Sequence, residues 1–186
     1  MAKVDFKELE KFADRISKLK QKDIDNFNED AIKELAQRLF AKVIKRTPVG
    51  KKPTLKMLGG ESKTVKAKGN SGKSKDFLSK QGAIIEQYWN GYVGGDLRRG
   101  WTIGSVTKTG TGYQIEVINP TEYASYVELG HRQEPGRFVP MIGKQLKKGW
   151  VPGKFMLTIS EKELERDAPR ILENKLNVFW RDVLNG

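Results

Sequence analysis

His131 is the only histidine in the 186-residue chain, and it lies among side chains that could carry out acid–base chemistry. Glu128 and Glu134 flank it, so either carboxylate could orient an imidazole acting as a general base. Such a site also needs a nucleophile or a metal, and no motif places a hydroxyl beside His131. The G-x-S-x-G elbow of serine hydrolases is absent as well. We therefore expect His131 to hydrogen-bond a neighbouring carboxylate or carbonyl and hold its loop, with no catalytic role.

Other common chemical sites are also missing from the sequence. The chain has no cysteine, which removes disulfides and thiolate ligands, and one histidine cannot form a multi-histidine metal site. The stretch Gly72-Lys73-Ser74 superficially resembles a phosphate-binding loop, but that motif needs glycine at the position that Ala67 occupies. We expect no catalytic residue, no cofactor and no metal.

Positive charge is concentrated in one part of the chain. The net charge is +12, and residues 42–80 carry twelve basic and two acidic side chains. Within this stretch, residues 49–75 are rich in Gly, Ser and Lys, with too few apolar residues to fill a core. The composition predicts a basic, mobile arm, which either lies free on the surface or touches nucleic acid. The DNA-proximal candidates are Lys51, Lys52, Lys56, Lys63, Lys66, Lys68, Lys73 and Lys75.

Two arginines precede a tryptophan at residues 98–101. Arg98 and Arg99 could bind a carboxylate or nucleic acid, because a guanidinium forms planar paired hydrogen bonds and stacks on aromatic rings. The alternative is the beginning of an ordinary strand, with one arginine in solvent and Trp101 in the core. The residues alone leave both interpretations open.

Apolar periodicity predicts helices at both ends of the chain. One spans about 5–20, and a second runs from Phe27 to Ile44, with Asp23 as a candidate N-cap and Thr47-Pro48 as its end. "KFMLTIS" could be a strand or the start of a helix. Ser160 and Glu163 fit a capping box for a long C-terminal helix, in which Pro169 would introduce a kink or a break.

The middle of the chain reads as strands and loops. Residues 100–119 predict an antiparallel hairpin around "KTGTG", and "PTEYASYVELG" predicts a short helix that starts at Pro120 and ends at Gly130. A short apolar helix is expected in "DFLSKQGAIIEQYW", and a loop from 130 to about 153. We place Trp101, Ile115, Val117 and Tyr126 in one core. The expected fold is a single α+β domain, 1–186, with a small antiparallel sheet and the arm 49–75 inserted.

Four fragments, in this order, resemble a known family. They are "RTPV" (46–49), "GGDLRRGWTIG" (94–104), "INPTEYASYVELGHRQ" (118–133) and "GWVPGKFMLTISEKEL" (149–164). Together they are similar to tail components of double-stranded DNA bacteriophages and prophages, which act as tail-completion or neck proteins. The resemblance covers roughly 30–186. About 45 residues separate the first two fragments here, where many relatives have almost none, and these residues include the basic arm.

The resemblance implies a structural virion protein of the head–tail junction, assembled in the host cytoplasm. Its subunits would form a homo-oligomeric ring, six- or twelve-fold, between the portal or head-closure protein and the tail terminator or tail tube. Packaged DNA could be touched nonspecifically. The residue types suited to subunit or partner contact are Arg98, Arg99, Tyr123, Tyr126, Glu128, His131 and Arg132.

Two other functions compete with this one. The first is nonspecific nucleic-acid binding through the basic arm, although residues 42–75 contain no Phe, Tyr or Trp on which bases could stack. The second is a hydrolase that uses Glu128 and His131. No apolar run of about 18 residues is present, so we expect no membrane span, and the N-terminus lacks the apolar region of a signal peptide.

Overall fold

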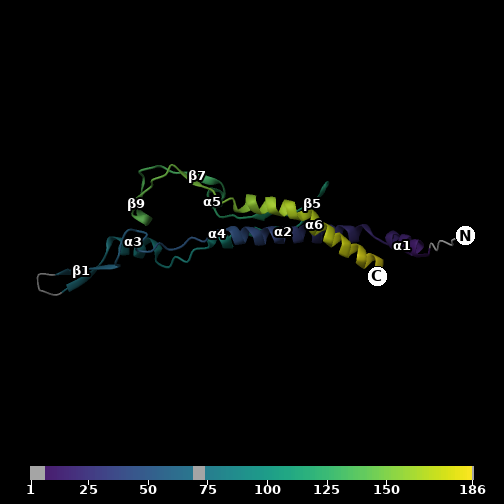
Figure 1. Ribbon diagram of the computed structural model, residues 1–186, viewed down its shortest axis with the longest axis horizontal. Helices are drawn as coiled ribbons and strands as arrows, with labels where there is room; N and C mark the ends of the chain where they lie inside the picture. Colours follow the sequence, from purple (N-terminus) through teal and green to yellow (C-terminus); the bar gives the residue numbers. More distant parts are fainter. Residues whose placement is uncertain (1–6, 69–73, 186) are drawn as a thin grey trace. The chain divides into compact units, whose positions relative to one another are not determined.

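The computed structural model describes residues 7–68 and 74–185 (Figure 1). The fold is an α+β mixture with small antiparallel sheets and a long C-terminal helix, as the sequence predicts. Its residues group into two compact units. Unit 1 comprises Met1–Arg46, Trp101–Pro120 and Met156–Gly186, and unit 2 comprises Thr47–Gly100 and Thr121–Phe155. The single domain, 1–186, stays a prediction.

Unit 1 is built on two long helices that lie side by side (Figure 1). Its elements are α1 (Lys7–Ser17), α2 (Gln21–Arg46), β3 (Thr102–Ile103), β4 (Thr107–Thr109), β5 (Gly112–Gln114), β6 (Val117–Ile118) and α6 (Met156–Asn185). The order of contacts along α2 and α6 is antiparallel, because Lys42 pairs with Glu163 whereas Phe27 stacks on Phe179, 5.0 Å between ring centroids.

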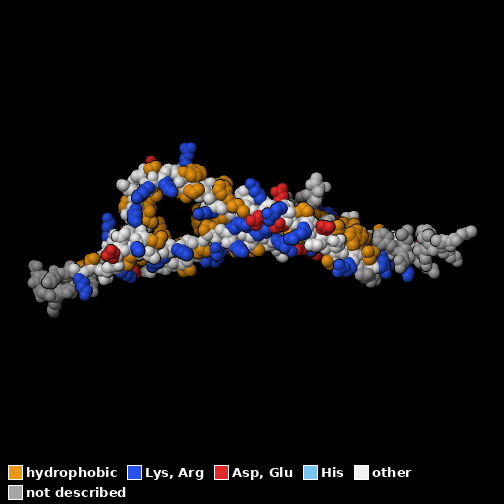
Figure 2. All heavy atoms as spheres, viewed as in Figure 1, with side chains coloured by type: hydrophobic (Ala, Val, Ile, Leu, Met, Phe, Trp, Pro, Cys, Tyr) orange, Lys and Arg blue, Asp and Glu red, His pale blue; other side chains and the backbone are white. Residues whose placement is uncertain are grey.

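Ion pairs join the C-terminal half of α2 to α6. Lys42 Nζ lies 3.1 Å from Glu163 and 3.2 Å from Asp167, and Arg46 pairs with Glu163 and donates to the hydroxyl of Ser160 at 3.0 Å. Arg46, then Lys42, lower the pKa of Glu163 by donating hydrogen bonds to its charged form. Acidic and basic side chains are accordingly interspersed over this helix pair (Figure 2).

The helix ends differ in detail from the sequence predictions. Asp23 is not the N-cap of α2: it lies inside the first turn, where its carboxylate accepts from the Lys20 amide at 3.0 Å. The capping box at Ser160 is also wrong. Helix α6 already begins at Met156, so Ser160 is fully buried inside it and donates to the Met156 carbonyl at 2.6 Å. The helix runs through Pro169 without a break.

The predicted hairpin of unit 1 is confirmed. Strand β3 pairs with β6 and β4 pairs with β5, all antiparallel, and the Gly104 amide donates to Glu116 between the two ladders. Trp101 is buried, whereas Ile115 and Val117 are half-buried. The hairpin is fixed to α2 by Asp25, which accepts from Lys108 Nζ and from the Tyr113 hydroxyl, both at 2.7 Å.

Unit 2 consists of short elements. They are β1 (Thr64–Lys68), β2 (Ser74–Leu78), α3 (Lys80–Trp89), α4 (Asp96–Arg99), α5 (Ala124–Leu129), β7 (Gly130–Arg132), β8 (Phe138–Val139), η1 (Pro140–Ile142), β9 (Lys144–Gln145) and β10 (Trp150–Pro152). The apolar helix expected in this region is shorter than predicted, because its first residues form β2 and Ser79 caps α3 by accepting from Gly82 at 3.1 Å.

Residues 49–75 contain defined structure. A turn at residues 55–59 buries Leu58, although the sequence has few apolar residues here, and β1 and β2 then form an antiparallel hairpin. Residues 69–73, which include Lys73, lie outside the described residues. The strands β1 and β2 thus occupy part of the second half of the arm. The mobility of the arm stays a prediction.

Residues 130–153 form an antiparallel ribbon and not the predicted loop. Strand β7 pairs with β10 and β8 pairs with β9, and η1 closes the end. Two side chains tie this end to other parts of unit 2: Trp89 Nε1 donates to the Met141 carbonyl at 2.7 Å, and Lys144 Nζ donates to the Met57 carbonyl at 2.6 Å. Prolines and glycines occur where the ladder is interrupted, so their abundance indicated a loop.

Candidate assembly surface

Helix α5 buries none of its apolar side chains. The short helix predicted in "PTEYASYVELG" is present and ends before Gly130. It starts at Ala124, four residues after the predicted start at Pro120. Tyr123, Tyr126 and Leu129 recur every third residue, so they follow one side of the helix. Tyr126 is 57% exposed and Leu129 is 59% exposed. The prediction that Tyr126 belongs to the core with Trp101 is therefore wrong.

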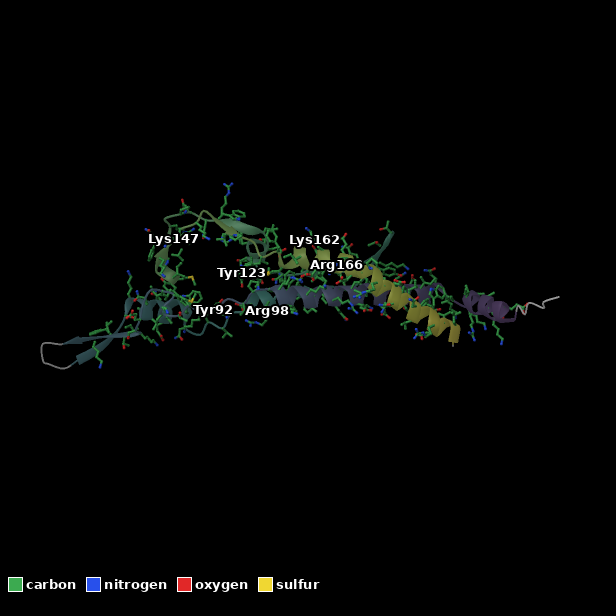
Figure 3. The ribbon with its side chains drawn as sticks, viewed as in Figure 1. Tyr92, Arg98, Tyr123, Lys147, Lys162 and Arg166 are labelled. Carbon is green, nitrogen blue, oxygen red and sulfur yellow. The ribbon has the colours of Figure 1, made fainter. Side chains whose placement is uncertain are left out.

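A second exposed aromatic side chain, Trp150, lies close to the end of α5. Trp150 lies on β10 opposite Arg132 of β7 and is itself exposed. A Cβ built on Gly130, at the end of α5, would stand 3.0 Å from the Trp150 ring. We call Tyr123, Tyr126 and Leu129 the α5 surface; Figure 3 labels Tyr123 at its start.

The backbone below the α5 surface is closely packed. The last carbonyls of α5 accept hydrogen bonds from the segment that precedes α6. The Lys154 amide donates to the Val127 carbonyl at 2.8 Å, and the Phe155 amide donates to the Glu128 carbonyl at 3.0 Å. Gly130 has φ +85°, and a Cβ there would lie 2.5 Å from the Val151 carbonyl oxygen. Glycine is therefore required where α5 turns into β7, and the exposed side chains stand on a fixed support.

His131 packs against the α5 surface. Its ring meets Tyr126 edge to face, with 5.7 Å between centroids, and its Nδ1 is buried with no hydrogen-bond partner. The expected hydrogen bond from His131 to a carboxylate or carbonyl is therefore not seen at this nitrogen. Backbone pairing between β7 and β10 holds the segment instead, and the imidazole supports Tyr126.

The remaining acid–base and contact candidates lie in different settings. Glu128 is half-buried. Arg132 is exposed and forms no ion pair among the described residues, so the expected fork with Glu122, Glu128 or Glu134 is not made within this chain. An unpaired guanidinium opposite the exposed Trp150 has the chemistry of an interface anchor.

Arg98 and Arg99 point to different partners on α4. Arg98 donates from Nε at 3.0 Å and from Nη2 at 2.5 Å to the carbonyl oxygen of buried Thr47, whereas exposed Arg99 pairs with Asp96 at 2.5 Å. Figure 3 labels Arg98 on this short helix. Of the two open alternatives, the arrangement matches one arginine in solvent with Trp101 buried, while Arg98 fixes the chain that leaves α2.

The basic candidates differ in their surroundings. Lys51, Lys52, Lys56 and Lys66 are exposed, and Lys63 pairs with Glu86 at 3.2 Å. The side chains of Lys68, Lys73 and Lys75 lie outside the described residues. Exposure alone is equally consistent with solvent and with nucleic acid.

No site for metal chemistry is formed by the residues that the structure describes. No three His, Asp or Glu side chains among them are placed to hold a metal ion. Within the same residues, no helix is long and apolar enough to cross a bilayer. The features that stand out are exposed apolar and charged surfaces.

Comparison with known proteins gives one match. No curated protein and no solved structure matches the chain. Residues 10–130 match the HK97-gp10-like family, described as "Bacteriophage HK97-gp10, putative tail-component". The matched region includes α2, the hairpin of unit 1 and α5 up to its C-terminal glycine. The chain belongs to this family of bacteriophage tail components.

Proposed function

We propose that the protein is a structural subunit of the phage head–tail junction that acts by assembling with its own copies into a ring. The observation that carries this is the α5 surface, on which Tyr126 and Leu129 are more than half exposed above a closely packed backbone. Apolar and aromatic side chains held in this way form the buried centre of protein interfaces. Membership of a tail-component family gives such an interface a setting in the virion.

The ring would join the portal or head-closure protein to the tail terminator or tail tube. Its stoichiometry would be six- or twelve-fold. Within it, the α5 surface and Arg132 would contact a neighbour, and no reaction is needed for this role. The hydrolase alternative would need a carboxylate to orient the imidazole, and the buried Nδ1 of His131 donates no hydrogen bond to one.

The test combines assembly in solution with assembly of the virion. Tyr126→Ser with Leu129→Ser removes the two most exposed side chains of α5. We expect this variant to lose rings by native mass spectrometry and to leave heads and tails unjoined in complementation of a deletion phage. The matched control is Tyr88→Ser, which removes another exposed tyrosine of unit 2 and should assemble normally. Normal joining by the double variant would contradict the proposal.

Nonspecific DNA binding through the exposed lysines of the arm remains the alternative. It predicts that the isolated subunit binds duplex DNA with an affinity that falls steeply with salt, and that replacing Lys51, Lys52, Lys56 and Lys66 abolishes this binding. If the same replacement leaves joined heads and tails intact, DNA binding is not needed for assembly.

A further inference from the structure

The ribbon 130–152 of unit 2 carries positive charge that carboxylates do not balance. It contains five basic residues and one acidic residue, Glu134. The long helices of unit 1 differ, because α2 has six basic and five acidic residues and α6 has five and six. The segment 136–149 has no acidic residue at all, and its basic residues are Arg137, Lys144, Lys147 and Lys148. All four are exposed, and none forms an ion pair among the described residues.

A β-bulge determines where Arg137 lies on the ribbon. The Arg137 amide donates to the Glu134 carbonyl at 3.2 Å and closes a turn in which Gly136 has φ +87°. The Gly136 amide then donates to the Leu146 carbonyl at 2.8 Å, and the Leu146 amide donates to the Arg137 carbonyl at 2.9 Å. Two residues of one strand therefore oppose one residue of the other, which is a bulge with a left-handed glycine as its first residue. The bulge holds Arg137 opposite Leu146.

Arg137 and Lys144 lie on the same face of the ribbon. Val139 stands directly opposite Lys144 in the β8–β9 register. Arg137 precedes Val139 by two residues, and side chains two residues apart on a strand point to the same side. Lys144 and Arg137 are thus diagonal neighbours, about 7 Å apart at their Cβ atoms. The ammonium of Lys144 donates to the Met57 carbonyl at 2.6 Å, which leaves two of its three donors for a ligand.

Lys148 extends this face, and Lys147 does not. The strand stays paired beyond Leu146, because the Gln133 amide donates to the Gly149 carbonyl at 3.0 Å. Lys148 follows Leu146 by two residues, so alternation places it on the same side, about 7 Å along the strand. Lys147 comes directly after Leu146 and belongs to the opposite face. We call Arg137, Lys144 and Lys148 the ribbon cations.

The composition of this face favours phosphate over a protein partner. Lysine is depleted at protein–protein interfaces, whereas rows of exposed lysine and arginine are the usual contacts to a nucleic-acid backbone. A duplex carries one negative charge per about 1.7 Å of its axis, so cations spaced about 7 Å apart each find a phosphate within reach. The ribbon is also tied at its end, since Trp89 Nε1 donates to the Met141 carbonyl at 2.7 Å. A fixed array loses less conformational freedom on binding than a free arm.

We propose that the ribbon cations bind the phosphate backbone of duplex DNA without reading its bases. The contact is electrostatic, so it weakens as counterions compete at higher salt. The site differs from the arm 49–75, whose Lys63 is paired with Glu86. The inference goes beyond the proposed function and does not depend on ring formation.

DNA binding by the full-length protein tests the site. The probe is a fluorescein-labelled duplex of random sequence, and anisotropy is measured over a range of salt concentrations. The double variant Arg137→Ala with Lys148→Ala should raise the dissociation constant about tenfold at about 50 mM salt. It should also lower the slope of log K against log salt by about 2, one unit for each lost phosphate contact. An unchanged circular dichroism spectrum and melting temperature establish that the variant is folded.

A matched variant controls for the loss of charge. Lys162→Ala with Arg170→Ala also removes one lysine and one arginine, both exposed on α6 and without an ion pair among the described residues; Figure 3 labels Lys162. Its dissociation constant should stay within about twofold of the unsubstituted protein. Lys147→Ala tests the face of the ribbon, because Lys147 is the neighbour of Lys148 on the other side. We expect Lys148→Ala to weaken binding about threefold and Lys147→Ala to leave it nearly unchanged.

Several results would overturn the assignment. They are a protein that does not bind the duplex at low salt, equal losses for the ribbon and α6 variants, or binding lost only when Lys51, Lys52, Lys56 and Lys66 of the arm are replaced. Unchanged DNA binding with lost rings in the ribbon variant would also overturn it and make the ribbon a protein contact. The proposed function is tested separately, because rings and head–tail joining that depend on Tyr126 and Leu129 persist whether or not the ribbon binds DNA.

Discussion

The guanidinium of Arg98 is bound to the carbonyl oxygen of Thr47 by two hydrogen bonds, 3.0 and 2.5 Å long. Thr47 is fully buried where the chain leaves α2, and Arg98 lies on α4, far along the sequence. Two donors from one planar group fix both position and direction, so this contact locks the first residue of unit 2 against α4.

Replacing Arg98 by lysine should therefore destabilise the protein although the charge is kept. An ammonium can reach one acceptor but cannot reproduce the fork, and a hydrogen bond that involves a charged group contributes about 1.5–3 kcal/mol. We expect the free energy of unfolding in urea to fall by about 1–2 kcal/mol. Arg99→Lys is the control, since Arg99 is exposed and its partner Asp96 lies on the same turn. Equal effects of the two changes would contradict the structural role of Arg98.

Trp101 and Trp150 allow the same substitution to be compared at a buried and at an exposed position. Trp101 is 7% exposed in unit 1, whereas Trp150 is 50% exposed on β10 in unit 2. Trp101→Ala should cost about 3–5 kcal/mol and lower the melting temperature sharply, because it removes a large buried side chain. Trp150→Ala should leave the melting temperature of the dissociated subunit within about a degree or two and reduce self-association. A melting temperature unchanged by Trp101→Ala would remove Trp101 from the core.

The sequence predicted elements whose periodicity is strong and whose neighbours are local. The α2 and α6 helices and the 100–119 hairpin were identified because their apolar spacing is maintained over many residues. The ribbon 130–152 was missed, since Pro and Gly mask a ladder that depends on pairing between distant residues. Capping at Ser160 was misassigned because its hydroxyl bonds back to the preceding turn, a contact that spacing does not distinguish from a cap.

The candidate surface was predicted only in part. Aromatic and arginine residues around 123–132 were identified as contact candidates from their types alone. That Tyr126 is exposed depends on the direction of α5, which is set by amides of Lys154 and Phe155 from the following segment. The β1–β2 hairpin was missed because Val65 was placed in the arm 49–75 and Phe77 in the short apolar helix, so no register joined the two residues.

Acid should weaken the link between the unit 1 hairpin and α2. Hydrogen bonds from Lys108, then from Tyr113 and Gln21, lower the pKa of Asp25 to about 2. A carboxyl with a lowered folded pKa stabilises the protein above its unfolded pKa of about 3.9, and this stability is lost as the pH falls towards 2. The deficit of Asp25→Asn in unfolding free energy should therefore be largest at pH 5 and shrink between pH 4 and 2.

Other carboxylates also make the stability of the protein depend on acid pH. Glu34, Glu163 and Asp167 also have lowered pKa values because of their bonds to arginine or lysine, so the Asp25→Asn protein keeps part of its acid sensitivity. Asp14→Asn removes a carboxylate that forms no ion pair among the described residues, so it serves as the control for the loss of one negative charge. A constant deficit for Asp25→Asn over the same range would show that the bonds to Lys108 and Tyr113 do not persist in solution.

Limited proteolysis tests the predicted mobility of residues 49–75. Lys51, Lys52 and Lys56 are exposed and lie outside regular strands and helices, so trypsin should cut here before it cuts within 100–130. Lys66 lies in a paired strand and should be cut more slowly. The order of cuts is read by mass spectrometry of early time points. First cleavage at Lys108, inside the unit 1 hairpin, would contradict the prediction.

The last prediction concerns His131 and Arg132, which follow each other on β7. His131 supports Tyr126 through an edge-to-face contact, and Arg132 is exposed with no ion pair among the residues the structure describes. His131→Ala should therefore leave the subunit folded but remove the ring contact that holds Tyr126. Arg132→Lys should keep the positive charge but lose the two parallel hydrogen bonds that a guanidinium can donate to a carboxylate of a neighbouring subunit. We expect both variants to be incorporated less well into virions, scored by joined heads and tails, with circular dichroism unchanged. Arg137→Lys, an exposed arginine on the same ribbon, is the control and should join normally. Normal joining by both His131→Ala and Arg132→Lys would show that β7 does not determine assembly, and a hydrolytic turnover lost in His131→Ala would restore the catalytic alternative.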